Sequence, residues 1–298
     1  MSVAARVGAA VWLVSGVSGA CPCGVVAGPS APLTGVADTW AAGATLSYLR
    51  EVASFDERGQ RYATPGGVAV GRALLDVALG RRLSPRWELS AVGTVGFAHT
   101  ALRGVESHGA LLGDTVLRAR ALAWTPFGNV AAPTVSAWVG LRLPTAAGAA
   151  SNPALASVSG VGLGAWESSL GAEARWNLSR AWQVTGYGEA GVRTTAGLET
   201  AATPGPRVLA GVAGVFLPTP RVALSVGLSG WWEAAPTRDG QRVSEGALQR
   251  TTSTVAMTVQ HGAHWRLGIL AAIDLPVEGL GRNVPALVRG GVSAVWTP

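Results

Sequence analysis

Histidine is the side chain best suited to acid–base chemistry near neutral pH. This sequence has four histidines, at His99, His108, His261 and His264. Two of them are next to a hydroxyl residue, in the pairs His99-Thr100 and Ser107-His108. A hydrolase needs its nucleophile within hydrogen-bond reach of a base, but no Gly-x-Ser-x-Gly motif accompanies either pair. We therefore predict no catalytic residue and no enzymatic activity.

Metal and cofactor chemistry is equally poorly represented. Cys21 and Cys23 stand in Cys-Pro-Cys-Gly, where a disulfide across one residue would be strained. Two thiolates alone make an incomplete metal site, so we interpret this stretch as a flexible leader. The glycine-rich run at 160–164 lacks the preceding strand and following helix of a phosphate-binding loop. We predict no metal and no cofactor.

Arginine is the residue type whose placement is most suggestive. Arginines recur on the polar side of segments that alternate apolar and polar residues, whereas others, such as Arg81 and Arg86, cluster at the short turns. We expect eight of the former to line an interior: Arg72, Arg118, Arg120, Arg142, Arg175, Arg193, Arg266 and Arg289. Arg207 shares this parity, as do the acids Asp76, Glu88, Glu173, Glu189 and Asp274. Rings of arginine in a wet bore favour anions. The alternative is that these charges pair across strands and fill the interior.

The segments that carry the arginines alternate with a period of two residues, which is typical of β-strands with two unlike faces. Residues 134–143 show this well, with Val135, Val139 and Leu141 on one face and Ser136 and Arg142 on the other. Twelve such segments follow one another, each close to the 9–11 residues of a tilted membrane-spanning strand. Their expected ranges are 42–52, 68–82, 87–98, 115–124, 134–143, 166–178, 182–193, 207–217, 222–232, 251–261, 265–275 and 286–296.

The connections alternate as well. Short ones are expected at 82–86, 125–133, 179–181, 218–220 and 262–264, and mostly longer ones at 53–67, 100–113, 145–165, 194–206, 233–249 and 276–285. Tryptophan opens the strand after three short turns, at Trp87, Trp182 and Trp265. Short turns at one end, long loops at the other and interfacial tryptophans are typical of outer-membrane barrels. We predict an all-β, transmembrane antiparallel up-and-down barrel of about twelve strands, with both termini periplasmic.

The N-terminus has the features of an export signal. Arg6 precedes an apolar stretch at 7–17, and Ser18-Gly19-Ala20 provides a small-residue cleavage site. That stretch is too short for a membrane-spanning helix. We expect a signal peptide at 1–20, a periplasmic leader at 21–41 and the barrel at 42–298; whether Cys21 is lipidated stays open.

Composition bears on the class of partner. Charged residues make up only 13% of the 298 residues against 48% hydrophobic, whereas about a quarter of a typical soluble chain is charged. The net charge is +6 and comes from arginine alone, because the sequence has no lysine. Since these arginines are spread out and follow an export signal, we do not expect nucleic acid as a partner.

One segment carries a resemblance. Gly113-Asp114-Thr115-Val116-Leu117-Arg118-Ala119-Arg120 resembles the Gly-Asp-plus-strand signature of a broad set of outer-membrane barrels, which includes the transporters assigned to the MetA pathway of phenol degradation. The stretch at 140–145 is similar to the strand end that enters a long loop in that group. The likeness covers the middle third of the chain. It departs at the end, where Thr297-Pro298 follows Trp296 in place of a terminal aromatic residue.

This resemblance implies a barrel and suggests transport across the outer membrane of a Gram-negative bacterium. Our first hypothesis is a passive or weakly selective, porin-like channel for small polar or anionic solutes. The second is a plugged barrel with a structural or surface-interaction role, and the third is a lipid-modifying barrel enzyme. Expected partners are the bilayer, outer-membrane lipids, the barrel-assembly machinery and small solutes.

Overall fold

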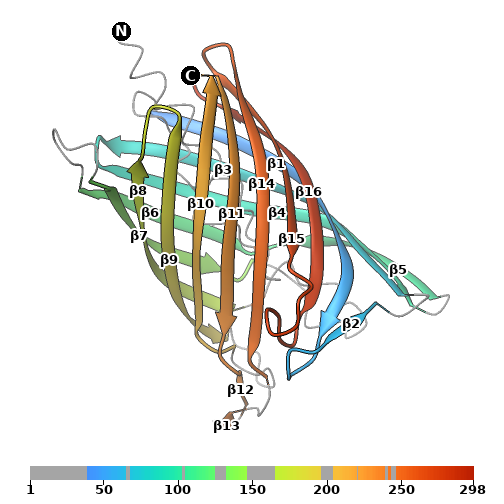
Figure 1. Ribbon diagram of the computed structural model, residues 1–298. Coiled ribbons are helices and arrows are strands. Elements are labelled where there is room, and N and C mark those ends of the chain that lie inside the picture. The colour runs from blue at the N-terminus through green and yellow to red at the C-terminus, as the bar shows by residue number, and fades with distance from the viewer. Residues whose placement is uncertain are drawn as a thin grey trace.

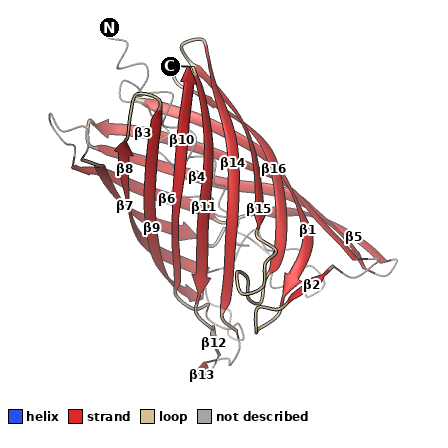
Figure 2. Cartoon of the chain, in the orientation of Figure 1, coloured by secondary structure: helices blue, strands red, loops and turns tan. Residues whose placement is uncertain are grey.

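In the computed structural model, the alternating segments form long antiparallel strands that close into a barrel (Figure 1). The structure describes residues 39–64, 68–102, 105–124, 132–145, 165–195, 204–219, 221–238, 241–242 and 246–298. Every regular element in these ranges is a strand (Figure 2), and none of the described residues forms a helix that could span a membrane. The predicted fold class, a twelve-stranded barrel, is confirmed.

Twelve strands make up the wall. They are β1 (Trp40–Phe55), β3 (Val68–Ser84), β4 (Trp87–Leu102), β6 (Thr115–Trp124), β7 (Thr134–Leu143), β8 (Ala165–Asn177), β9 (Trp182–Thr195), β10 (Arg207–Thr219), β11 (Val222–Glu233), β14 (Leu248–His261), β15 (Trp265–Asp274) and β16 (Pro285–Trp296). Each pairs with the next in this order, and β16 pairs with β1 to close the ring. Closure leaves no wall edge open to pair with another chain.

Side-chain and backbone geometry explains the short turns. In the turn between β3 and β4, the Ser84 hydroxyl accepts hydrogen bonds from the backbone N–H groups of Arg86 and Trp87. Ser179 does the same between β8 and β9, accepting from Ala181 and Trp182. Serine at this place stabilises a tight turn by replacing a backbone acceptor. The turn between β14 and β15 instead uses Gly262, at a φ of 65° that favours glycine.

The two faces of the wall differ as the alternation predicts. On β3, Leu75, Val77 and Leu79 are exposed, whereas their neighbours Leu74 and Asp76 are buried. Every wall strand exposes at least one leucine, valine or isoleucine side chain, and such an apolar exterior suits contact with lipid. The outer face of the barrel is therefore its lipid-facing surface.

Inside the barrel, apolar side chains meet at the end that carries the longer connections. Ala53 and Phe55 of β1, Leu209 of β10, Trp231 of β11, and Val284 with Ala286 at the start of β16 form one buried cluster, the inner apolar cluster. Tyr187 of β9 and Leu248 of β14 pack against it. Strands on well-separated parts of the ring therefore touch through their side chains.

The structure adds four short strands that the sequence did not predict: β2 (Arg61–Ala63), β5 (Val105–Leu112), β12 (Thr237–Arg238) and β13 (Gln241–Arg242). They lie toward the end of the barrel away from the C-terminus (Figure 1). The longer connection expected at 100–113 contains one of them: β5 pairs with β4, with Leu112 opposite Val95 at one end of the ladder and Val105 opposite Leu102 at the other. The predicted signal peptide, most of the leader, both cysteines and the loop at 146–164 lie outside the described residues.

Candidate functional site: the charged interior

The arginines that the sequence placed on the polar side of the strands point into the barrel. Seven of the eight are buried, and Arg118 is partly buried: Arg72 on β3, Arg118 and Arg120 on β6, Arg142 on β7, Arg175 on β8, Arg193 on β9, Arg266 on β15 and Arg289 on β16. Arg207 on β10 and Arg250 on β14 join them. Each needs a counter-charge or water, because an isolated buried charge is very costly.

Glu167 of β8 is the centre of the largest ionic group. Its Oε2 accepts from Nε of Arg193 at 2.7 Å, and its Oε1 accepts from Nε and Nη2 of Arg207 at 2.9 and 2.5 Å. Strand register explains this in part, since Arg193 on β9 and Arg142 on β7 both lie directly opposite Glu167. Opposite charges at directly paired positions stabilise a sheet.

Glu189 of β9 forms the second node. It accepts hydrogen bonds from Arg118 Nη2 at 3.0 Å, Arg207 Nη2 at 2.6 Å and the indole Nε1 of Trp138 at 2.8 Å. The guanidinium carbon of Arg118 also lies 5.6 Å from the centre of the Trp138 ring, within reach of a cation–π contact. Arg207 thus links the nodes of Glu167 and Glu189.

Two further acids, Glu173 and Glu233, form three more ion pairs among β6, β8, β9 and β11. Glu173 accepts hydrogen bonds from Arg120 and, at 3.0 Å, from Arg175. Glu233 accepts from Arg193 Nη1 at 2.5 Å. Strands from β6 to β11 are therefore joined inside the barrel by charge-assisted hydrogen bonds as well as by their backbone ladder.

A second ionic group lies on the other part of the ring. Asp76 of β3 accepts from Thr94 Oγ1 at 2.6 Å and from Arg289 Nη2 of β16 at 3.3 Å, which bridges over β1. Asp274 of β15 pairs with Arg250 Nε of β14 at 3.2 Å. These buried carboxylates have specific partners, as buried charges require.

Sequence reasoning missed several members of these groups. Glu167, Glu233 and Asp114 are buried acids inside the barrel, and Asp114 interacts electrostatically with Arg142. Arg250 was missed because it precedes the expected start of its strand. Their parity within β8, β11 and β14 was the available signal. With these acids included, the interior is closer to charge balance than the predicted arginine excess.

Arg142 is the least well satisfied of these cations. Its Nε lies 3.8 Å from Glu167 Oε2, beyond hydrogen-bond reach, because Arg193 and Arg207 already occupy both carboxylate oxygens. Across the described parts of the chain, neither Nε nor Nη1 of Arg142 finds a hydrogen-bond partner, although both atoms are buried. A buried donor without an acceptor is unfavourable, so this guanidinium retains capacity for an anion.

Replacing Trp138 with Phe tests the link between the indole and Glu189. The indole is buried and donates to a carboxylate, and hydrogen bonds to charged groups contribute about 1.5–3 kcal/mol. We expect the free energy of unfolding to fall by about that amount in a urea titration followed by tryptophan fluorescence. Trp87→Phe, at an exposed position on the outer face, should change it by a few tenths of a kcal/mol; equal losses would contradict the assignment.

The histidines do not converge on a reactive site. His99 of β4 and His108 of β5 are directly paired across the two strands, with ring centres 5.7 Å apart. Glu106 lies 3.9 Å from His99. His264 contacts the backbone carbonyl of Thr297 at 2.8 Å. Within the described ranges, no group of three or more His, Cys, Asp or Glu side chains is placed to hold a metal.

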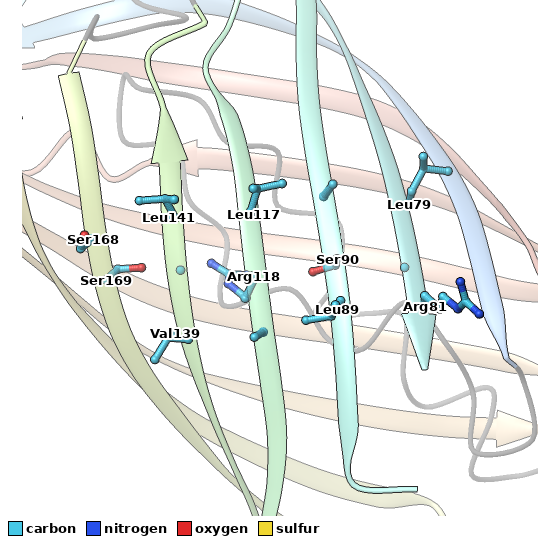
Figure 3. A pocket seen from close by; sticks show the side chains of 14 residues that line it. Leu79, Arg81, Leu89, Ser90, Leu117, Arg118, Val139, Leu141, Ser168 and Ser169 are labelled. Atoms are coloured by element: carbon cyan, nitrogen blue, oxygen red, sulfur yellow. The ribbon is translucent and has the colours of Figure 1, made fainter. Parts of the chain in front are cut away.

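The outer wall carries a shallow hollow across β3, β4, β6 and β7. Leu79, Leu89, Leu117, Val139 and Leu141 line it from these neighbouring strands (Figure 3). Small residues such as Ala91 and Ala119 lie between them. Arg118 and the β8 residues Ser168 and Ser169 also line it. Because its leucines and valines are exposed on the outer face, the hollow suits acyl chains of the lipid.

Aromatic residues mark both ends of the outer face. Trp87, Trp182 and Trp265 are exposed beside the short turns, and Trp166 and Trp232 are exposed at the opposite end. Trp40 and Trp296 meet edge to face at 4.7 Å where β1 pairs with β16. Two aromatic belts of this kind flank the apolar band of outer-membrane barrels.

Comparison with known structures agrees with this geometry. The chain is similar to the COG4313 outer membrane channel from Pseudomonas putida F1, with a TM-score of 0.71 and 16% identity over 88% of this chain and 96% of that one. The fold is that of an outer-membrane barrel. The β domain of the Bordetella autotransporter BrkA is also similar, with a TM-score of 0.54 and 12% identity over 88% of this chain and 100% of that one.

Identities this low establish the fold alone. No family model matches the chain, and no curated protein matches it. The barrel fold together with its lipid-facing exterior supports an outer-membrane location. The resemblance to the phenol-degradation transporters, the assembly machinery as a partner and the periplasmic placement of the termini stay predictions.

Proposed function

We propose that this protein is an outer-membrane channel for small polar or anionic solutes, with both termini in the periplasm. The observation that carries this proposal is the segregation of charge: guanidinium and carboxylate groups face the inside of a closed barrel whose outside is apolar. Polar interiors of this kind are typical of water-filled barrels. The similarity to a solved outer-membrane channel adds support.

The preference for anions rests on Arg142. Most interior arginines are neutralised by carboxylates, so their combined field is weaker than their number suggests. Arg142 differs in that two of its buried nitrogens, Nε and Nη1, lack a hydrogen-bond acceptor within the described ranges, whereas other interior arginines such as Arg289 lack one for a single nitrogen. A guanidinium whose N–H groups lack acceptors can donate hydrogen bonds to an anion that passes through the barrel, and its positive charge repels cations.

A plugged barrel with a structural or surface-interaction role is the second candidate. It is favoured by the low exposure of the interior charges, such as Glu167 and Arg193, whose side chains are each 3% exposed. Densely paired charges hold neighbouring strands together without providing a path for solutes. The two candidates differ in whether ions cross the folded protein.

Conductance in a planar lipid bilayer distinguishes these candidates. We expect discrete current steps from the purified barrel, and a reversal potential of anion-selective sign in a salt gradient. Arg142→Gln should shift that potential toward cation selectivity, because it removes an interior positive charge whose Nε and Nη1 have no hydrogen-bond acceptor among the described residues. Arg86→Gln, in an exposed short turn, should leave it unchanged.

A shift of equal size with Arg86→Gln would contradict the role of Arg142. Arg118 and Arg120 are unsuitable for charge reversal, because both are engaged with buried glutamates. Reversal there would place like charges together inside the barrel and disturb folding.

A further inference from the structure

We propose that the connection between β15 and β16, residues 275–284, is a lid that closes the bore by pressing Val284 against Phe55 and the inner apolar cluster. This inference rests on the proposed channel function and adds a gate to it. It is carried by three sets of contacts: with the inner apolar cluster, with the turn that follows β1 and with the start of β14.

The first set of contacts is apolar. Val284 is 5% exposed and belongs to the same cluster as Phe55, Leu209 and Trp231, which are 5%, 1% and 4% exposed. β16 and β11 are separated in the ring by β14 and β15, so this cluster spans the interior instead of following one strand pair. The side chains that meet across the interior here are aliphatic, phenyl and indole groups.

The second set joins the lid to the turn that follows β1. Phe55 N–H donates to the Val284 carbonyl at 2.9 Å, and Asn283 N–H donates to the Asp56 carbonyl at 3.1 Å. Gly279 N–H donates to the Gly59 carbonyl at 3.1 Å. These bonds hold the lid against the start of the β1–β2 connection.

The third set joins the lid to the start of β14. Gln249 and Arg282 exchange both backbone hydrogen bonds, at 3.0 and 2.9 Å. The Asn283 side chain donates to the Ala247 carbonyl at 2.9 Å. The lid is thus fastened on two sides, by few bonds on each.

Backbone conformation gives the lid its shape. Gly279 and Asn283 have positive φ angles of 80° and 51°, and Gly59 opposite them has 76°; these values let the chain reverse direction sharply. Gly281 lies so close to Phe55 that an added Cβ would be 2.2 Å from its ring. The lid therefore fits onto Phe55 only because a side chain is missing at this position.

An apolar constriction blocks ions because water leaves it and a charge cannot follow without its hydration shell. When the lid lifts, the backbone groups that it releases can bond to water, so the main cost of opening is the loss of apolar contact around Phe55. Opening would remove this apolar barrier from the interior, where charged side chains such as Arg207 and Glu233 lie two residues from Leu209 and Trp231.

Truncating the gate side chains should favour the open state. Phe55→Ala and, separately, Val284→Ala should raise the open probability in bilayer recordings on the order of tenfold. A tenfold change corresponds to a loss of about 1.4 kcal/mol in the free energy that favours the closed state over the open state. Phe97→Ala removes an exposed aromatic from the outer face and should leave the open probability unchanged. Unaltered gating in both cluster variants, with native heat-modifiable migration on gels, would overturn the proposal.

Thiol labelling reads the lid independently of conductance. Ala286 lies within the inner apolar cluster and is fully buried. In a background with Cys21→Ser and Cys23→Ser, the Ala286→Cys thiol should react slowly with a small charged maleimide, and on the order of tenfold faster when Phe55→Ala is added, following the same ratio. Fast labelling without Phe55→Ala would overturn the gate.

The two readouts also separate the gate from the channel. Accelerated labelling with no current from any variant would retain the lid and reject the channel. Current from the wild-type barrel with no effect of the cluster variants on labelling or gating would retain the channel and reject the lid.

Discussion

Replacing Glu167 with Gln should lower the free energy of unfolding by about 3–5 kcal/mol, the cost of removing one partner from a buried ion pair. Arg193 and Arg207 would each lose a charged hydrogen-bond acceptor. Arg142 would lose the carboxylate with which it forms an ion pair. Their side chains are 7% exposed or less, so water cannot replace the lost charge. Urea titrations of the barrel in lipid vesicles, followed by tryptophan fluorescence, would measure this loss.

Glu106→Gln is the matched control. It makes the same chemical change on β5, where the side chain is 66% exposed, and exposed pairs contribute about 0–1 kcal/mol. Similar stabilities for Glu167→Gln and Glu106→Gln would mean that water reaches Glu167 and its three arginines, contrary to the burial of these side chains.

Introducing Arg at Ile269 should hinder insertion into the membrane. Ile269 lies in the middle of β15 and is 53% exposed on the outer face, where an arginine near the bilayer midplane costs about 2–4 kcal/mol. The yield of folded, heat-modifiable protein in vesicles of defined thickness would report the effect. Val95→Arg, in the middle of β4, should behave in the same way.

Depth provides the control for this experiment. Leu83 is also exposed on the outer face but lies beside the short turn that ends β3. Arginine near the interface costs only about 0–1 kcal/mol, so Leu83→Arg should fold almost normally. Equal impairment at Leu83 and Ile269 would show that the band of lipid contact is not where the exposed aliphatic residues place it.

The strands were predictable because their period is local. The expected ranges at 115–124 and 134–143 agree with β6 and β7 at both ends, since turn residues bound each alternating run. Other strands extend further than predicted: β1 begins at Trp40 and β4 continues to Leu102. Strand ends outside the bilayer are not limited by membrane thickness, so hydrophobic alternation does not mark them.

β5 was missed for a related reason. Its residues, Val105–Leu112, include Glu106, His108 and Gly109, which resemble a polar loop when only composition is considered. The strand forms because the extended end of β4 provides a partner for it. That requirement depends on how far one strand projects beyond its neighbours, which is a property of the assembled sheet.

The inward side of each strand was predictable, but the ion pairs were not. Alternation placed Arg142, Arg193 and Arg289 on one face, whereas the pairing of Arg289 with Asp76 joins positions 213 residues apart. Such contacts depend on the stagger of all twelve strands. Thr94 illustrates the limit: the alternation within 87–98 indicates its inward direction, but not that it is 1% exposed and donates a hydrogen bond to Asp76.

The junction of β1 with β16 has a consequence for conformational entropy. In this junction Ala42 lies opposite Trp296 at one end, and Ser54 lies opposite Pro285 at the other. Every other junction of the wall joins strands that are neighbours in the sequence or are separated only by short strands. Closing a loop of roughly 250 residues costs about 3 kcal/mol more than closing a hairpin of roughly ten. Trp40 at the start of β1 contacts Trp296 at the end of β16, at the end of the barrel that carries the short turns. This contact offsets part of the entropic cost of the pairing between β1 and β16.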